Sequence, residues 1–576
     1  MPIKILDQEV VMRIAAGEVV ERPASVVKEL VENSIDAGAS QISVEVRGGG
    51  VNLIRVTDNG TGIKSSEIEL AFQRYATSKI ARIDDLDSIT SLGFRGEALP
   101  SIAAVAEVEV VASTSSNPSG SYVSMKDGVK LDEGRRGRAR GTTITVRDLL
   151  RNVPARLKFL KSATTENSHI ANIISQYALA YPEVRFSLSV DGRTTLKTPG
   201  SGQLLDSIVE VYGSEIARNM LQLIGGEKRW EGGEVTSVKV TGMVSSPAVS
   251  RSSRNYLSFF VNRRYINSRL LTWAVEEAYR GLLMQGKHPV AVINIEVETG
   301  EVDVNVHPTK IEVKFRDERP VFSAVQKAVR GALVELAPVP GIGEVATAYG
   351  EQRQSSQIPR SLWTTGKSDT VPSPLVSSGE SQPTPVDSLP ALRLLGQIAG
   401  SYIVAEGPEG LYIIDQHAAH ERIVFEQILS QSSRREVDVQ GLLEPSTLEV
   451  APQQDEILLT KYEELSGFGF SIEPFGDRTY LVRAVPAVLN GKDWAATLRE
   501  LLDSLVAEGK SDWQEKMAIS IACHSAIRAG QAMTDDEMRE LIRQLEQTAT
   551  PNTCPHGRPT IIRLASTQLE KEFRRT

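Results

Sequence analysis

Two side chains near the start of the chain have types and a spacing that could serve nucleotide hydrolysis. Glu29 and Asn33 are four residues apart in a segment whose apolar residues have helical spacing, so both would project from one helix face. An amide oxygen suits Mg²⁺, and a carboxylate one turn away could take a proton from an attacking water. Taken alone, such a pair more often marks a solvated helix face.

A third polar side chain stands at the end of an alternating apolar strand. Asp58 is followed by Asn-Gly-Thr-Gly, and its carboxylate could accept a hydrogen bond from the exocyclic amine of adenine. Guanine presents an acceptor at that position and would be repelled. Downstream, residues 76–79 (ATSK) and 93–99 (GFRGEAL) could turn backbone N–H groups toward phosphates. Each fragment by itself is also an ordinary turn or loop.

A second set of chemistry-bearing residues lies near the end of the chain. Residues 415–421 read DQHAAHE, so His417 and Glu421 would face one way on a helix that Asp415 begins. Far downstream, Cys554 and His556 stand two apart in a Gly-Pro loop. Thiolate, imidazole and carboxylate groups together suit Zn²⁺. A capped helix and an ordinary turn are the plain alternatives.

The nucleotide fragments, in this order and spacing, resemble the GHKL ATPases, which include gyrases, Hsp90 chaperones and sensor histidine kinases. The segments VENSIDAGA, TDNGTGI, RYATSKI and GFRGEAL are similar to those of the MutL mismatch-repair family in particular. The resemblance extends over nearly the whole chain. It implies an α+β multidomain protein: a GHKL (Bergerat) ATPase α/β sandwich, a ribosomal-S5-like α/β domain, a disordered linker, and a C-terminal α+β dimerisation and endonuclease domain.

The resemblance also implies roles in ATP binding. Glu29 looks like the general base, Asn33 like the Mg²⁺ ligand and Asp58 like the adenine-binding carboxylate. Lys310, which follows a strand of the second domain, resembles the lysine that reaches the γ-phosphate. The other ATP contacts implied by the matching motifs are Gly60, Gly62, Thr77, Ser78, Lys79, Gly93, Phe94, Arg95, Gly96, Glu97, Ala98, Leu99 and Thr143.

The C-terminal motifs resemble those of the MutL branch that carries an endonuclease. DQHAAHERIVFE, SIACHSAIRAG and CPHGRP match its metal motifs, although His524 stands where nuclease-bearing members often have Lys or Arg. We expect catalysis by Asp415, His417 and Glu421, and Zn²⁺ or Mn²⁺ held by Asp415, His417, Glu421, Cys554 and His556. The alternative hypothesis is a non-nucleolytic, ATP-switched matchmaker that recruits a separate nuclease. A histidine kinase or a topoisomerase fits the motif order less well.

Partners are predicted from basic clusters and from one short peptide. We expect sequence-independent binding of double- and single-stranded DNA through backbone phosphates, with contacts from Arg151, Arg156, Lys158, Arg263 and Arg264. The resemblance implies a homodimer that works with the MutS mismatch sensor. Residues 440–445 (QGLLEP) resemble the family's peptide for the replication sliding clamp, with contacts from Gln440, Leu443 and Pro445.

The spacing of apolar residues predicts the elements that position these groups. Helices are expected over residues 23–33, 270–283, 418–430, 513–528 and 535–547, and hairpins over 41–58 and 401–415. Residues 338–390 hold eight of the 27 prolines and lose apolar periodicity, which predicts a disordered linker. The expected domains are 1–215, 216–336, the linker 337–390, and 391–576 with a regulatory subdomain at about 445–545.

Composition excludes several classes of protein. Of 576 residues, 41% are hydrophobic and 24% charged, which is typical of globular domains and excludes collagen-like or wholly disordered chains. The sequence contains no uncharged run of 18 residues, so no membrane span is predicted. Two cysteines suit a reducing compartment. We therefore expect a cytoplasmic, nucleoid-associated protein. With a net charge of −9, nucleic-acid contacts must come from local basic patches.

Overall fold

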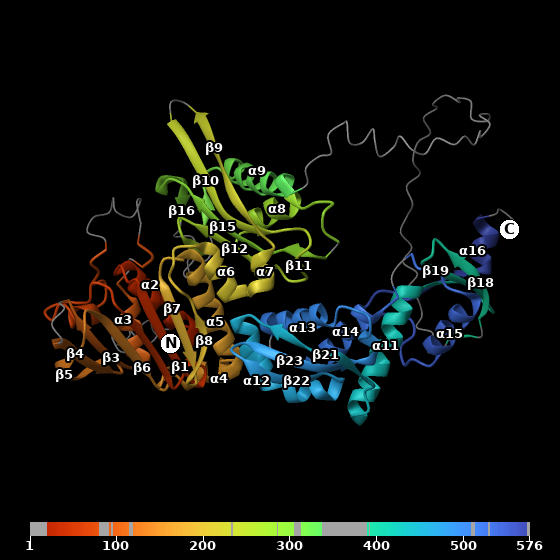
Figure 1. The fold of residues 1–576 in the computed structure, drawn as a ribbon, viewed down its shortest axis with the longest axis horizontal. Coiled ribbons are helices and arrows are strands. Elements are labelled where there is room, and N and C mark those ends of the chain that lie inside the picture. The colour runs from red at the N-terminus through yellow and green to blue at the C-terminus, as the bar shows by residue number, and fades with distance from the viewer. Residues whose placement is uncertain are drawn as a thin grey trace, which may run out of the picture. The chain divides into compact units, whose positions relative to one another are not determined.

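The computed structural model divides the chain into two compact units, Met1–Leu333 with Val424–Ala526, and Val334–Ile423 with Ile527–Thr576 (Figure 1). The division into four domains that we expect from the sequence stays a prediction. The structure describes residues 20–79, 91–93, 96–114, 119–231, 234–284, 286–303, 313–336, 389–390, 392–508, 513–527 and 530–572.

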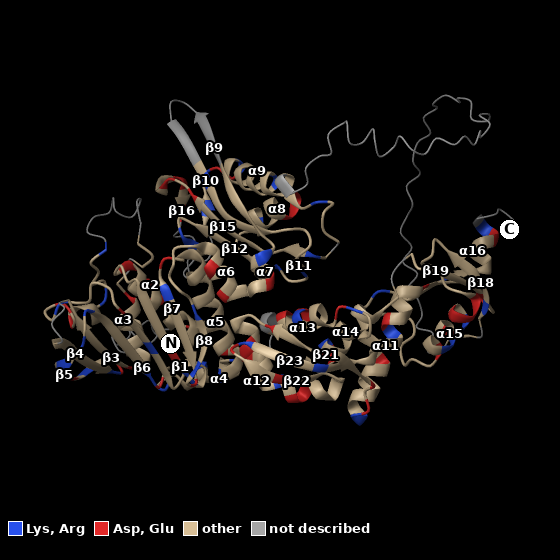
Figure 2. Ribbon diagram, viewed as in Figure 1, with Lys and Arg blue, Asp and Glu red and all other residues tan. Residues whose placement is uncertain are grey.

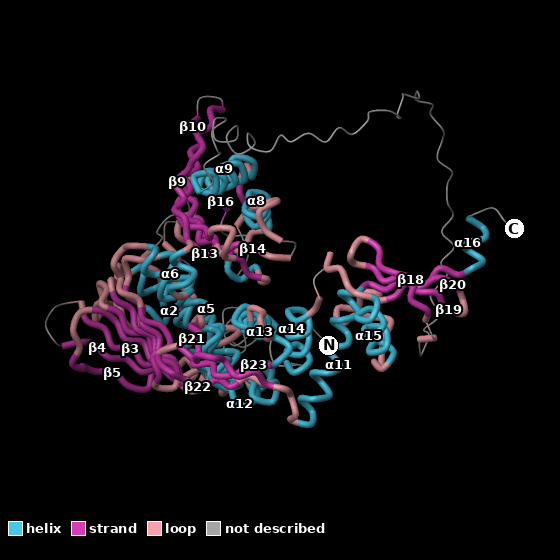
Figure 3. The backbone as a smooth tube through the Cα atoms, turned by 45° about the vertical axis from the view of Figure 1, so that its right-hand side comes forward, coloured by secondary structure: helices cyan, strands magenta, loops and turns pink. Residues whose placement is uncertain are grey.

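An eight-stranded sheet in the order β5-β4-β3-β6-β2-β1-β7-β8 forms the first domain. Its helices α2, α3 and α5 pack on one face, so the domain has one layer of strands and one of helices (Figure 3). The strands are β1 (Gln41–Arg47), β2 (Leu53–Asp58), β3 (Glu107–Ser113), β4 (Ser119–Lys126), β5 (Val129–Gly137), β6 (Gly141–Arg147), β7 (Arg185–Val190) and β8 (Arg193–Lys197). The helices are α2 (Pro23–Asp36), α3 (Ala98–Val105), α4 (Pro154–Phe159) and α5 (Ala163–Ala180).

The predicted hairpin over residues 41–58 is confirmed, because β1 and β2 pair antiparallel from Ile42 with Asp58 to Arg47 with Leu53. Successive side chains of a strand point to opposite faces, so every second residue of β1 is buried against the helices and the residues between them are partly exposed. The turn is made by three glycines with positive φ. A Cβ on Gly49 would come within 2.8 Å of the Ala163 backbone, so the turn can lie against the start of α5 only because this side chain is absent.

A five-stranded sheet in the order β13-β12-β15-β10-β9 forms the second domain. Helices α8 and α9 bury apolar residues in its core. The predicted helix at 270–283 is confirmed but shorter, because α8 ends at Ala278. The strands of the sheet are β9 (Met220–Glu231), β10 (Glu234–Ser245), β12 (Leu257–Val261), β13 (Arg264–Ile266) and β15 (Ala291–Glu296). The helices of this part of the chain are α6 (Leu204–Tyr212), α7 (Ser214–Arg218), α8 (Arg269–Ala278) and α9 (Glu318–Leu336). Two short antiparallel pairs are formed by β11 (Ser250–Arg251) with β14 (His288–Pro289) and by β16 (Val302–Asp303) with β17 (Lys314–Phe315).

The remainder of the first unit is an α+β segment with its own apolar core. Its three strands have the order β21-β23-β22. They are β21 (Val439–Glu449), β22 (Ser471–Gly476) and β23 (Thr479–Pro486), and the helices are α12 (Pro452–Leu465), α13 (Trp494–Glu508) and α14 (Trp513–Ser525). The predicted helix at 513–528 is therefore confirmed in position, although α14 ends at Ser525.

The second unit is a four-stranded sheet in the order β18-β19-β20-β24, with helices packed against it. The predicted hairpin over 401–415 is confirmed as the antiparallel pair of β19 and β20, and the predicted helix at 535–547 is confirmed as α15. Helix α11 begins directly after Asp415, slightly earlier than predicted. The elements are β18 (Arg393–Ile398), β19 (Tyr402–Gly407), β20 (Gly410–Asp415), the start of α11 (Gln416–Arg434), α15 (Asp535–Glu546), β24 (Ile561–Ala565) and α16 (Ser566–Glu572).

Two further expectations concern the linker and the absence of a membrane span. The predicted linker at 337–390 lies almost wholly outside the described residues. Among the helices that the structure describes, none is long and apolar enough to span a membrane.

Candidate functional site

Helix α2 carries two of the predicted nucleotide residues on its less buried side. Pro23 occupies the first turn, where its missing N–H is no loss, and the apolar residues Val27 and Leu30 are buried in the domain core. Glu29 and Asn33 remain partly accessible on the remaining face. The helical spacing thus places a carboxylate and an amide side by side at the surface of the domain, as the sequence predicts.

The strand end at Asp58 is joined directly to this helix. The hydroxyl of Ser34 on α2 donates to Asp58 Oδ2 at 3.1 Å, and the N–H groups of Gly60 and Thr142 donate to Oδ1 at 2.9 and 3.1 Å. Burial raises the pKa of the Asp58 carboxyl, while these hydrogen bonds oppose that rise. Three donors fix both oxygens, so the carboxylate is held as an oriented acceptor.

Two glycines with positive φ allow the backbone to close around Asp58. A Cβ on Gly141 would lie 2.1 Å from the Asp58 carbonyl oxygen, and a Cβ on Gly62 would lie 2.1 Å from the Ser113 carbonyl oxygen. Any larger residue would push the loop after β2 away from its neighbours, so Gly62 is required for the shape of the site.

Lys79 from the predicted phosphate loop lies against the predicted Mg²⁺ ligand. Its Nζ donates to Asn33 Oδ1 at 2.9 Å and to Asp36 Oδ2 at 2.5 Å. Asp36 also accepts the N–H groups of Leu92 and Gly93, at 2.9 and 3.1 Å. The ammonium of Lys79 therefore lies beside the amide oxygen of Asn33, where Mg²⁺ is expected. The residues that flank segment 80–90 on both sides contact α2.

The other predicted ATP residues lie around the same helix and strand. The hydroxyls of Thr143 on β6 and Thr57 on β2 are 3.2 Å apart, and Thr77 Oγ1 accepts the N–H of Lys79. Of the remaining residues, the structure describes Gly60, Ser78, Gly96, Glu97, Ala98 and Leu99, whereas Phe94, Arg95 and Lys310 lie outside the described residues.

The predicted DNA contacts differ in how accessible they are. Lys158 on α4 is exposed, and Arg156 donates to the carbonyl of Val20. Arg151 and Arg263 are exposed, and each forms an ion pair with a neighbouring carboxylate. Figure 2 shows that acidic residues lie among the basic ones over these elements.

Arg264 corrects the expected DNA patch. Its side chain is only 8% exposed, and its Nη2 donates to the carbonyl of Ser91 at 3.0 Å. A guanidinium that is folded into the domain in this way cannot also lie along a phosphate backbone. The two arginines are adjacent in the sequence, but Arg263 lies in the turn after β12 with positive φ and Arg264 begins β13, so their side chains take different directions.

The predicted clamp peptide lies on β21 and is presented to solvent. Pairing of β21 with β23 is interrupted between Gly441 and Ser446, so the chain bulges over the intervening residues. Gln440, Leu443 and Pro445 are exposed, and Leu443 is fully so. The side chains of the predicted peptide are therefore accessible on this part of β21.

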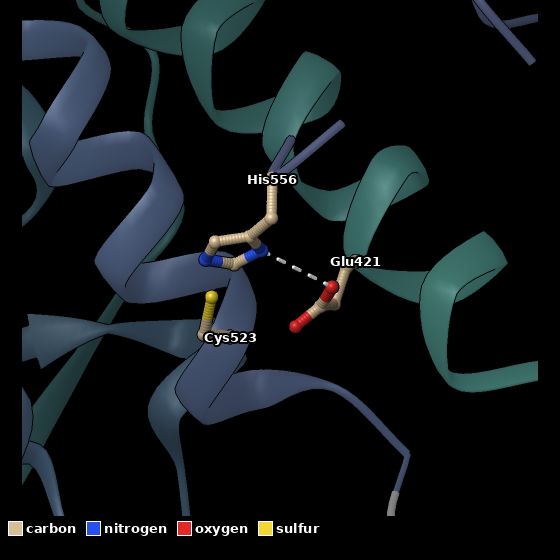
Figure 4. Close-up of side chains that lie close together, drawn as sticks. All are labelled: Glu421, Cys523 and His556. Carbon is tan, nitrogen blue, oxygen red and sulfur yellow. Dashed lines mark ion pairs between the residues drawn. The ribbon is translucent and has the colours of Figure 1, made fainter. Parts of the chain in front are cut away.

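Glu421, near the start of α11, pairs separately with two of the other predicted metal residues of the second unit. Glu421 is buried, and its carboxylate lies 3.4 Å from His417 Nε2. The same carboxylate lies 3.6 Å from His556 Nδ1, and Figure 4 draws this second pair. His417 Nδ1 contacts the carbonyl oxygen of Ile527 at 2.8 Å, which orients the ring. The Glu421 hydrogen bond raises the pKa of His417 to about 9. Carboxylate and imidazole groups are ligand types that suit Zn²⁺ or Mn²⁺.

The structure does not assemble all five predicted ligands into one cluster. Although all five lie within the described residues, no three of them have ligand atoms within 4.8 Å of one another. Asp415 Oδ1 instead accepts the N–H groups of His417 and Ala418, at 2.9 and 3.1 Å. This carboxylate therefore caps the N-terminus of α11.

The two cysteines of the chain lie in different settings. Cys554 is buried in the loop that also carries His556, and its backbone N–H donates to the carbonyl of Arg558 at 2.8 Å. Cys523, also drawn in Figure 4, lies on α14 in the first compact unit. No ligand role was predicted for Cys523, and the signal that could have suggested one is its place in the matched motif SIACHSAIRAG.

Three family models match the chain in succession. Residues 21–134 match a model described as "Histidine kinase-, DNA gyrase B-, and HSP90-like ATPase". Residues 208–334 match "DNA mismatch repair protein, C-terminal domain", and residues 395–533 match "MutL C terminal dimerisation domain". The first of these models covers the helix and strand that carry Glu29, Asn33 and Asp58, so these three residues lie in a GHKL ATPase domain.

Full-length relatives agree with these models. A DNA mismatch repair protein MutL of Desulforudis audaxviator (strain MP104C) is 42% identical over 583 residues, which cover 100% of this chain and 99% of the relative. The protein of the same description from Koribacter versatilis (strain Ellin345) is 39% identical, with 100% and 99% covered. A solved structure described as the N terminal domain of a DNA repair protein is 26% identical with a TM-score of 0.50, and covers 57% of this chain and 98% of that chain. The chain therefore belongs to the MutL family of DNA mismatch repair proteins.

Proposed function

We propose that the chain is an ATP-gated DNA mismatch repair protein whose first domain hydrolyses ATP and whose C-terminal region nicks DNA at a bound metal. The observation that carries the ATP part is the hydrogen bond from Ser34 to Asp58, because it holds α2 and the end of β2 together. Asp58 would accept the exocyclic amine of adenine, and Asn33 Oδ1 would hold Mg²⁺. Mg²⁺ would neutralise charge on the phosphates when bound.

In the proposed reaction, Glu29 acts on the attacking water. The water oxygen forms a bond to the γ-phosphorus while the bond from that phosphorus to the bridging oxygen breaks. ADP leaves with the electron pair of the broken bond, and Glu29 accepts the proton of the water. Lys79 must first leave the oxygen of Asn33, on which it now lies at 2.9 Å. Its ammonium is then available for the phosphates, as the resemblance of its motif implies.

Substitution of Glu29 tests this assignment. Glu29→Ala should still bind ATP, because the side chain reaches the water rather than the nucleotide, while turnover falls by roughly 10²-fold or more. Asn33→Ala should instead weaken binding of the Mg²⁺ complex of the nucleotide. Turnover is measured by phosphate release, and binding by equilibrium titration. Wild-type turnover in Glu29→Ala would remove this residue from the role of base.

The endonuclease part of the proposal is supported by the pairs that Glu421 makes with His417 and His556. Two imidazoles and a buried carboxylate would hold Zn²⁺ or Mn²⁺, which supplies a Lewis acid for phosphodiester cleavage when bound. The alternative is an ATP-switched matchmaker without nuclease activity. His524 favours this alternative, because nuclease-bearing members often have Lys or Arg at that position. The Nε2 of His524 lies 2.7 Å from Glu500 Oε2, so this side chain already has an acidic partner.

Nicking of supercoiled plasmid with Mn²⁺ separates the two hypotheses. The wild-type protein should convert supercoiled DNA to the open circle, and Asp415→Asn should lose most of that conversion. Asn is itself a good helix cap, so the variant keeps α11 while it removes the charge. Nicking that is equal in both proteins would exclude Asp415 from catalysis, and a wild-type protein that does not nick would favour the matchmaker.

The proposed partners follow from the same family membership. The dimerisation model at 395–533 supports a homodimer. Exposed Lys158, Arg151 and Arg263 support sequence-independent contact with DNA phosphates, and the exposed QGLLEP bulge supports docking on the sliding clamp. Cooperation with the MutS mismatch sensor is proposed on the family's function alone.

A further inference from the structure

Glu29 has a cationic neighbour that is itself held from a second helix. Lys28 Nζ lies 3.3 Å from Glu29 Oε1 and 2.8 Å from Glu32 Oε1, all within helix α2. The hydroxyl of Tyr177, on helix α5, donates to the same Glu32 oxygen at 2.7 Å. The contacts therefore form one continuous path from the hydroxyl of Tyr177 through Glu32 and Lys28 to the carboxylate of Glu29.

This path lies in a buried setting where polar groups are costly. Glu32 is 3% exposed and Tyr177 is 7% exposed. Glu32 Oε2 is buried and has no hydrogen-bond partner among the described residues, so the tyrosine and the lysine both act on the other oxygen. A buried ion pair is often no more stabilising than apolar residues of similar size. Packing of α2 on α5 alone therefore does not account for these three polar groups.

The charges on the path are mutually consistent. Burial by itself would lower the pKa of Lys28, but the carboxylates of Glu32 and Glu29 outweigh it, and the pKa is raised. Burial, and then the neighbouring charge of Glu32, keep the pKa of Tyr177 well above its usual value, so its hydroxyl keeps its proton and acts as a donor. Lys28 is thus a fixed positive charge beside Glu29.

We propose that Tyr177, Glu32 and Lys28 are positioning residues that hold the carboxylate of Glu29 in one orientation for hydrolysis. The inference rests on the proposed role of Glu29 as the base. The hydroxyl of Tyr177 fixes the position of the Glu32 carboxylate, and that carboxylate fixes the position of the Lys28 ammonium. Lys28 in turn holds one oxygen of Glu29. A base that is already oriented loses less freedom when the water and the γ-phosphate align with it.

The test is a set of single and double variants of the full chain. Tyr177→Phe removes only the hydroxyl and should lower kcat about 3- to 10-fold, the range expected for one hydrogen bond, with the KM for ATP unchanged. Lys28→Met should lower kcat further, and Lys28→Arg should restore part of it. Tyr181→Phe is the matched control, because Tyr181 is similarly buried one turn further along and its hydroxyl makes no hydrogen bond to any residue that the structure describes.

A double variant separates positioning from a structural role. If Tyr177 acts through Glu29, then Tyr177→Phe should lower turnover in the wild-type background and have no further effect in Glu29→Ala. An equal fold-change in both backgrounds, or an effect of Tyr181→Phe as large as that of Tyr177→Phe, would overturn the inference. Full turnover in Glu29→Ala would instead overturn the proposed function, so the two failures can be distinguished.

Discussion

Asp58 shows how one side chain acquires a specific chemical task from its neighbours. Its carboxylate accepts hydrogen bonds from Ser34, Gly60 and Thr142, which come from a helix, a turn and the start of another strand. An unconstrained carboxylate at the end of a strand would rotate and be solvated. Here three donors leave it in one orientation, which is what the proposed recognition of adenine would require.

The metal site provides the prediction at the residue scale. His556→Ala should lower the zinc content of purified protein, with affinity falling by at least the roughly 10- to 100-fold that loss of an outer-shell partner costs. Cys554→Ser should do the same only if metal binding draws its thiol to the other ligands. Zinc per protein is measured by elemental mass spectrometry after dialysis against a weak chelator. The fold of each variant is checked by circular dichroism.

The chain's other cysteine is the matched control for that experiment. The structure describes both cysteines and neither forms a disulfide, so Cys523→Ser makes the same chemical change at a different place. Zinc that is lost only in Cys523→Ser would transfer the thiolate role from Cys554 to Cys523. Wild-type zinc in both cysteine variants would mean that neither thiol holds the metal.

Strand β21 provides the prediction at the scale of an element. Leu443 is fully exposed on the bulge, whereas its neighbour Leu442 packs partly against the apolar core of its segment. Leu443→Ala should therefore leave the free energy of unfolding within about 0.5 kcal/mol of wild type. The same variant should weaken binding to the sliding clamp about tenfold or more, because the leucine would be a buried anchor in that complex.

Leu442→Ala is the comparison for this prediction. It should lower stability, since it removes packed apolar surface, and should affect clamp binding less. Stability is measured by urea unfolding, and clamp binding by titration with the purified clamp protein. Unchanged clamp binding in Leu443→Ala would mean that QGLLEP is not the docking peptide.

The predicted linker provides the prediction at the scale of the whole molecule. About 53 flexible residues would have a root-mean-square span of about 40 Å. In a homodimer, ATP binding would let the two N-terminal domains pair and close a ring around duplex DNA. The protein with a non-hydrolysable ATP analogue should then stay on end-blocked linear DNA through a high-salt wash, and slide off DNA with free ends.

Linker length is the variable that tests the ring. Shortening residues 338–390 to about ten residues should abolish retention on end-blocked DNA, because the arms could no longer encircle a duplex, while ATP binding stays at the wild-type level. Retention is measured by the protein that remains on bead-bound DNA. Equal loss of the full-length protein from blocked and free-ended DNA would contradict the ring and leave only binding through phosphate contacts.

Sequence patterns were enough to predict the local helices and strands and to identify the candidate functional residues. Period-two and helical apolar patterns placed the β1–β2 hairpin and helices α2 and α11 within a few residues, because these patterns follow from burying one face of a strand or helix. The motifs placed Glu29, Asn33 and Asp58 in one ATPase domain. The family models and full-length relatives confirm that family assignment.

Which of those residues lie in contact could be seen only in the folded chain. Sequence spacing could not show that Arg264 folds inward, that Asp415 caps α11, or that Cys554 does not join the other predicted ligands in one cluster, because each depends on contacts between distant segments or on local backbone geometry. Tyr177 gave no signal in the sequence, since a tyrosine on an apolar helix face is ordinary core. It gains significance from Glu32, which lies 145 residues away in the chain and 2.7 Å away in the fold.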